Sequence, residues 1–108
     1  METTKSYVHI PDLRAQLPEV PTNSIISNTF YRDEKVKVML FSFAPGQELS
    51  EHTASVPAII QFLQGEGRLT LGNDEMDAKP GTWVHMPANL PHSILARTPL
   101  LMLLMMFS

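Results

Sequence analysis

Two histidines, His52 and His92, each follow a Pro-Gly turn and could form one binding site. His52 lies six residues after the glycine of a Pro45-Gly46 turn, and His92 lies eleven residues after the glycine of a Pro80-Gly81 turn. Imidazole is a common metal ligand and hydrogen-bonds readily to other groups. A sheet that curls into a barrel between these positions would bring the two rings face to face. The sequence therefore predicts one two-histidine site.

No other catalytic motif competes with this pair. The chain has no G-x-S-x-G, no Walker-type glycine loop and no H-E-x-x-H. It has no cysteine, which excludes disulfides and thiolate metal sites. Its net charge is −3, and no run of like charges exceeds two residues. We therefore expect neither a nucleic-acid partner nor a membrane partner.

Length and composition indicate one packed domain. The 108 residues are 44% hydrophobic, which suits a globular core rather than a disordered chain. The first ten residues lack the apolar segment of a signal peptide. The longest apolar run, residues 100–107, is far shorter than the roughly 20 residues of a membrane-spanning helix. We expect a soluble, cytoplasmic single domain over residues 1–108, with residues 1–22 as an N-terminal arm.

Strand patterns dominate from residue 24 onward. Turn residues recur about every 8–12 residues after Pro45, as in sandwiches and barrels, and no stretch keeps a helical period over a dozen residues. Only residues 11–17, which begin with Pro11 and Asp12, favour a short helical turn. Residues 7–10 suit a short strand. The other expected strands are residues 24–30, 35–44, 48–52, 58–64, 68–71, 75–78, 83–86, 92–97 and 100–107.

A break in the alternation and two glycine-containing segments predict further local features. Within residues 35–44 the alternation of apolar and polar residues slips by one position past Met39. The slip indicates either a bulge near Met39 or a strand that is buried on both faces. Glycines in residues 65–67 and 72–74 predict hairpin-type turns.

The final expected strand, residues 100–107, is apolar at every position. A strand with one wet face should alternate, so both of its faces should be covered. One face meets the core, and the other is covered either by a second copy of the chain or by residues 7–20 of the same chain. We expect a homodimer, because large exposed apolar patches are rare on monomers.

The spacing around His52 resembles that of the small single-domain cupins, the RmlC-like double-stranded β-helix family. The family's first motif runs G-x₅-H-x-H-x₃₋₄-E-x₆-G. Here Gly46, His52 and Gly65 match it, while Ala54 and Ala58 stand at the second histidine and the glutamate.

The second motif of the family runs G-x₅-P-x-G-x₂-H-x₃-N. Gly81, Pro87 and His92 match it, and Asn89 replaces the middle glycine, a change that a left-handed turn tolerates. The resemblance implies an all-β, jelly-roll-like cupin barrel with its motifs in residues 45–97.

The resemblance also implies a metal site, in reduced form. In the family, the two histidines and the glutamate of the first motif and the histidine of the second bind one metal ion. This chain keeps His52 and His92 and has Ala54 and Ala58 at the other two positions. A single divalent ion (Fe, Mn, Ni or Zn) would therefore be held weakly, because fewer ligands remain.

Strand alternation predicts which other side chains line the cavity. Counting by twos from His52 places Glu48 inward, and counting from Ala58 places Phe62 inward and Gln61 outward. Gln61 joins the site only if its side chain turns inward, and His85 is expected to point outward. The expected cavity lining is Glu48, Ala54, Ala58, Gln61 and Phe62.

Three functions are consistent with these features. The first is a small-molecule-binding protein, the second is a metal-dependent dioxygenase or isomerase acting on a small organic acid or phenol, and the third is a structural dimer. We favour binding, because Ala54 and Ala58 enlarge the cavity and leave it apolar around two polar groups. Whether the chain is an enzyme stays open, since one fold supports many chemistries.

Overall fold

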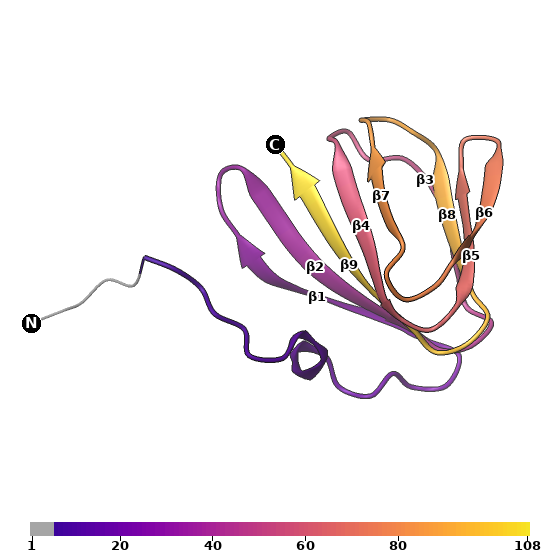
Figure 1. The fold of residues 1–108 in the computed structure, drawn as a ribbon, viewed down its shortest axis with the longest axis horizontal. Helices are drawn as coiled ribbons and strands as arrows, with labels where there is room; N and C mark the ends of the chain where they lie inside the picture. Colours follow the sequence, from indigo (N-terminus) through magenta and orange to yellow (C-terminus); the bar gives the residue numbers. More distant parts are fainter. Residues whose placement is uncertain (1–5) are drawn as a thin grey trace, which may run out of the picture.

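The computed structural model describes residues 6–108, and this part of the chain is almost entirely β (Figure 1). One 3₁₀ turn, η1 (Leu13–Gln16), precedes the strands. No helix within the described residues is long and apolar enough to cross a membrane. The strands are β1 (Ile25–Arg32), β2 (Val36–Phe43), β3 (Glu48–His52), β4 (Ala58–Gln64), β5 (Gly67–Leu71), β6 (Asp74–Ala78), β7 (Trp83–Met86), β8 (His92–Ala96) and β9 (Leu100–Phe107).

The strands form two antiparallel sheets that face each other. The five-stranded sheet has the order β1-β2-β9-β4-β7, and the four-stranded sheet has the order β3-β8-β5-β6. Apart from the β1-β2 and β5-β6 hairpins, each strand is followed by one in the opposite sheet. The sheets converge at one end and fan apart at the other, where β9 ends (Figure 1). The predicted all-β barrel with a short N-terminal helical turn is confirmed.

The core fills the space between the sheets. Alternation within β4 buries Ala58, Ile60 and Phe62 and leaves the residues between them partly exposed. Phe43 of β2 and Ile94 of β8 join this cluster and are almost completely buried. Each large side chain buried in this way contributes about 1.5–3 kcal/mol, so the core holds the two sheets, and the residues at their open end, in place.

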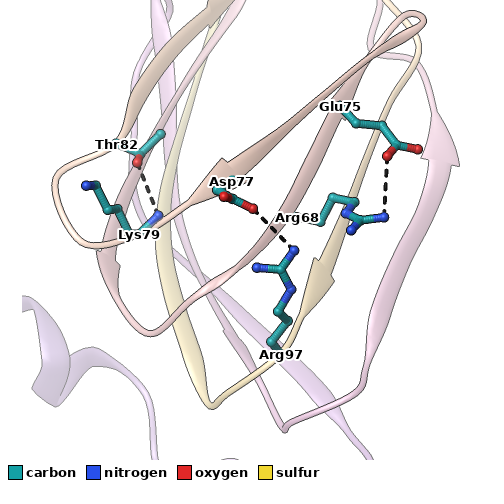
Figure 2. Close-up of polar contacts among 6 residues, drawn as sticks. All are labelled: Arg68, Glu75, Asp77, Lys79, Thr82 and Arg97. Atoms are coloured by element: carbon teal, nitrogen blue, oxygen red, sulfur yellow. Dashed lines mark hydrogen bonds and ion pairs between the residues drawn. The ribbon is translucent and has the colours of Figure 1, made fainter.

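The outer face of the four-stranded sheet is charged. Arg68 donates to Glu75 at 3.3 Å and Arg97 donates to Asp77 at 3.2 Å, all exposed (Figure 2). Exposed pairs of this kind contribute only about 0–1 kcal/mol to stability. The outer face of the four-stranded sheet is therefore polar and exposed to water.

The N-terminal arm covers only the first part of β9. Leu101, on the outer face of the five-stranded sheet, is 7% exposed, and it lines a surface cavity together with arm residues Leu17 and Pro18. The amide nitrogen of the Asn28 side chain donates to the Gln16 carbonyl at 3.2 Å and holds the arm in place. The second half of β9, Leu103–Phe107, is only half-buried. The chain therefore covers the base of this strand itself and leaves its other half open.

The slip in the pattern at Met39 reflects burial on both faces of β2. β2 pairs with β9 without interruption, and the bulge lies instead in β1, between Thr29 and Tyr31, opposite Met39. Leu40, on the outer face of β2, is 0% exposed. Leu40 is opposite Asn28 of β1, whose side chain is hydrogen-bonded to Gln16, so the N-terminal arm lies beside Leu40 on this face.

Two other local predictions require correction. Gly72 and Asn73 do close the β5-β6 hairpin, where Leu71 pairs with Asp74, but residues 65–67 form no hairpin, because they carry the chain from one sheet to the other. The short strand expected at residues 7–10 is absent, because within the described residues this segment pairs with no other strand.

Candidate functional site

His52 and His92 meet at the open end of the barrel. They are directly opposite each other in the pairing of β3 with β8. Their ring centroids are 4.2 Å apart, and the ring planes are inclined at 57°. The structure therefore brings together the two histidines that are 40 positions apart in the sequence.

A bulge in β3 sets the direction of each side chain in this strand. Leu49 pairs with Ile94, and His52 pairs with His92. Between these two pairs the chain advances by three residues in β3 but by only two in β8, so β3 contains one extra residue. The extra residue reverses the alternation. Leu49 consequently packs against the core, while Glu48 is exposed. The structure thus places Glu48 outside the cavity, contrary to the prediction from uninterrupted alternation.

Each ring is tied through Nδ1 to the backbone carbonyl two residues before it. The Nδ1 atom of His52 lies 2.8 Å from the Ser50 carbonyl oxygen, and that of His92 lies 2.9 Å from the Leu90 carbonyl oxygen. A carbonyl only accepts, so a neutral ring in this position donates its Nδ1–H and carries its lone pair on Nε2. Both histidines can therefore offer Nε2 to a ligand.

The two rings differ in exposure. His92 is 5% exposed, whereas His52 is largely accessible to solvent. Burial lowers the pKa of His92; the Leu90 carbonyl opposes this shift, and the nearby His52 adds to it. Burial thus favours a neutral His92 ring with an available lone pair.

A cavity of about 370 Å³ lies beside the two rings. Ala54 and Ala58 are part of its wall. Of the residues that the structure describes, no aspartate or glutamate contributes to its wall. The wall comprises Met39, Phe41, His52, Thr53, Ala54, Ser55, Val56, Ala58, Met86, His92, Leu104 and Met106.

The structure places the other predicted residues away from this cavity. Gln61 is opposite Leu103 and Trp83, on the outer face of the sheet, because it alternates with the buried Ile60 and Phe62. Phe62 does point inward, but it lies in the solid core and is 0% exposed.

His85 is exposed and pairs with Ile59 on the outer face of the five-stranded sheet, as the sequence predicts. The sequence alone does not predict the methionines of the cavity wall. They come from three strands, and the sequence alone does not say which strands are neighbours.

The loop before His92 is fixed by backbone hydrogen bonds. Asn89 has a φ of +68°, in the left-handed region, as expected for a residue that replaces glycine. Its backbone N–H donates to the Ala54 carbonyl at 2.7 Å, and the Gly72 N–H donates to the Pro91 carbonyl at 2.8 Å. These contacts join the loop to two neighbouring turns and hold His92 in position.

The donor groups do not fit a divalent metal of the expected kind. No group of three or more His, Cys, Asp or Glu side chains suited to a metal ion occurs in residues 6–108. Two neutral imidazoles leave most of the coordination sphere of Fe, Mn or Ni unfilled and its charge uncompensated. No reaction step through such an ion follows from this site.

A family model described as Cupin domain matches residues 39–106. Among solved structures, the chain is similar to a cupin superfamily protein from Desulfitobacterium hafniense DCB-2, with 26% sequence identity, a TM-score of 0.82 and coverage of 99% of this chain and 98% of that chain. It is also similar to an RmlC-like cupin protein from Desulfovibrio desulfuricans, with 25% identity, a TM-score of 0.75 and coverage of 92% and 97%.

A variant of salicylate 1,2-dioxygenase from Pseudoaminobacter salicylatoxidans has the same fold. It is 13% identical, with a TM-score of 0.74 and coverage of 86% of this chain and 29% of that chain. At this identity the likeness is one of fold alone. No curated protein matches the sequence significantly.

The lowered pKa of His92 predicts a pH-dependent stability. The unfolded chain protonates this imidazole near its usual pKa of 6.5, and the folded protein protonates it only at lower pH. The contribution of His92 is therefore fully present above pH 6.5 and is lost as the pH falls through the folded pKa. Urea unfolding over about pH 5 to 8 should show this loss in the unchanged protein and a smaller loss in His92→Leu.

The matched control for this measurement is His85→Leu, which leaves the buried ring in place and should keep the full pH dependence. A His92→Leu protein whose stability varies with pH as strongly as that of the unchanged protein would contradict the prediction.

Proposed function

We propose that this chain, which belongs to the cupin domain family, binds a small, largely apolar molecule in the cavity beside His52 and His92. The observation that carries the proposal is the combination of apolar walls with two convergent imidazoles. Ligand sites are usually apolar clefts of about 300–1,000 Å³ with a few polar groups that fix the orientation of the ligand.

The chemistry of the rings narrows the class of ligand. A neutral ring tied through Nδ1 presents Nε2 as an acceptor, so it suits a ligand that brings a hydroxyl donor. Phe41 and Leu104 in the wall supply apolar contact. A phenol combines both features. A small aromatic acid does so only through a ring hydroxyl, because its carboxylate is ionised near neutral pH and cannot donate.

Metal-dependent catalysis on the same class of molecule is the alternative. A dioxygenase or isomerase of this kind would need a metal ion with open coordination positions. The fold shared with a salicylate 1,2-dioxygenase is consistent with it. Ala54 and Ala58, which line the cavity, weigh against it because neither can donate to a metal. Binding is therefore the function we propose first.

We also propose that the protein is a homodimer that uses the outer face of the five-stranded sheet. Trp83 on this face is 56% exposed. Leu103, Met105 and Ile59 lie beside it in the pairing of β7, β4 and β9 and are half-buried. The four-stranded sheet carries ion pairs on its outer face, so of the two sheets the five-stranded one offers the apolar outer face that a second copy would cover.

A thermal-shift screen of phenols and small aromatic acids tests the binding proposal. At ten times its Kd a ligand stabilises the folded protein by about 1.4 kcal/mol, which should raise Tm by about 5 °C or more in a domain of this size. The double variant His52→Ala/His92→Ala should lose this effect, because the polar contacts are gone. His85→Ala, the matched control on the outer face, should keep it. A ligand that stabilises the double variant equally would show that it binds elsewhere.

Sedimentation velocity tests the dimer. The unchanged protein should sediment as a dimer, and Leu103→Lys should sediment as a folded monomer, because the new charge lies in the buried interface. Thr70→Lys places the same charge on β5 in the other sheet and should stay dimeric. A monomeric unchanged protein at all concentrations, or a dimeric Leu103→Lys, would rule out this interface.

A further inference from the structure

The cavity contains a second kind of donor atom besides the two imidazoles. Met39, Met86 and Met106 line the same wall as His52 and His92. Thioether sulfur is a soft metal ligand, and imidazole binds both soft and borderline metals. Of the residues that the structure describes, no carboxylate reaches this wall. The donor set is therefore neutral, and it is rich in sulfur.

Strand pairing brings two of these methionines to one point. Ala58 is opposite Met86 of β7 on one side and Met106 of β9 on the other. Residues that are opposite in an antiparallel pair have Cβ atoms about 5 Å apart, and methionine has three rotatable bonds with which to place its sulfur. The side chain of Ala58 ends at Cβ, and all three residues line the cavity. The alanine at the glutamate position of the family motif thus lies between two methionine residues in the sheet.

The charge of the ion decides which metal suits such a site. The free energy needed to move an ion out of water rises with the square of its charge in the Born description, so a monovalent ion costs about a quarter as much as a divalent ion of the same size. Neutral nitrogen and sulfur donors offset none of that charge. Cu(I) is monovalent and favours soft ligands such as thioethers.

We propose that the cavity binds one Cu(I) ion through Nε2 of His52, Nε2 of His92 and the sulfur of Met86 or Met106. This inference rests on the proposed role of the two histidines as the polar contacts of the cavity. It replaces the weakly held divalent ion expected from the sequence with a monovalent one. Because the ion and the hydroxyl of an organic ligand would use the same Nε2 atoms, the two ligands would compete for the cavity.

An anaerobic competition titration of the untagged full chain with Cu(I) and bicinchoninate tests the proposal. The unchanged protein should withdraw one Cu(I) per chain from the chelator. The double variant Met86→Leu/Met106→Leu should bind about tenfold more weakly or worse, equivalent to a loss of about 1.4 kcal/mol or more. Leucine keeps the volume of methionine, so the variant should fold. Met76→Leu, on β6 and outside the cavity wall, should bind as the unchanged protein does.

X-ray absorption at the copper edge shows directly whether a sulfur atom is bound to the ion. It therefore distinguishes methionine ligands from methionines that affect binding only through packing. A sulfur scatterer should be present in the unchanged protein and absent in the double methionine variant. A protein that takes no Cu(I) from the chelator overturns the inference. So does a double methionine variant with undiminished affinity.

The organic-ligand screen separates a failure of this inference from a failure of the proposed function. The double methionine variant should lose Cu(I) yet still be stabilised by the organic ligand, and His52→Ala/His92→Ala should lose both. If the unchanged protein binds no Cu(I) but keeps stabilisation that depends on the histidines, only the copper inference falls. If neither ligand depends on the histidines, both proposals fall.

Discussion

The pairing of β3 with β8 is the constraint on which the site depends. It places His52 directly opposite His92, and the bulge in β3 turns the first ring toward the cavity while its neighbour Leu49 stays in the core. Hydrogen bonds from each Nδ1 to a backbone carbonyl then fix the rings. Such contacts set both the tautomer and the orientation of a histidine. The backbone therefore decides that both Nε2 atoms are free.

The second property of the site is its neutrality. A charged side chain in the cavity wall would select an oppositely charged ligand or a divalent ion, but Ala58 stands at the position of the family motif's glutamate, and Ala54 stands at the position of its second histidine. What remains is an apolar space with two acceptor nitrogens and several thioethers. This composition favours soft or weakly polar ligands, since a strongly charged one would lose its hydration without compensation.

The fold and the histidine pair could be predicted from the sequence because motif spacing and strand alternation are local properties. The placement of Glu48 could not, because a single extra residue in β3 reverses the alternation. The neighbours of Ala58 could not be predicted either. Met86 and Met106 reach it only because β7 and β9 flank β4, and strand order is set by packing over the whole chain. The sequence therefore predicts the cavity residues that lie in motifs but not those whose position depends on the order of the strands.

Nuclear magnetic resonance of the imidazole nitrogens in ¹⁵N-labelled protein is the most direct test of the paired site. At alkaline pH, spectra that correlate ring nitrogens with ring carbon-bound hydrogens should show the Nδ1–H tautomer for both His52 and His92. Both Nε2 signals should move together when a ligand is added, while those of His85 stay unchanged. An Nε2–H tautomer at either ring, or a ligand that shifts only one of the pair, would contradict the account.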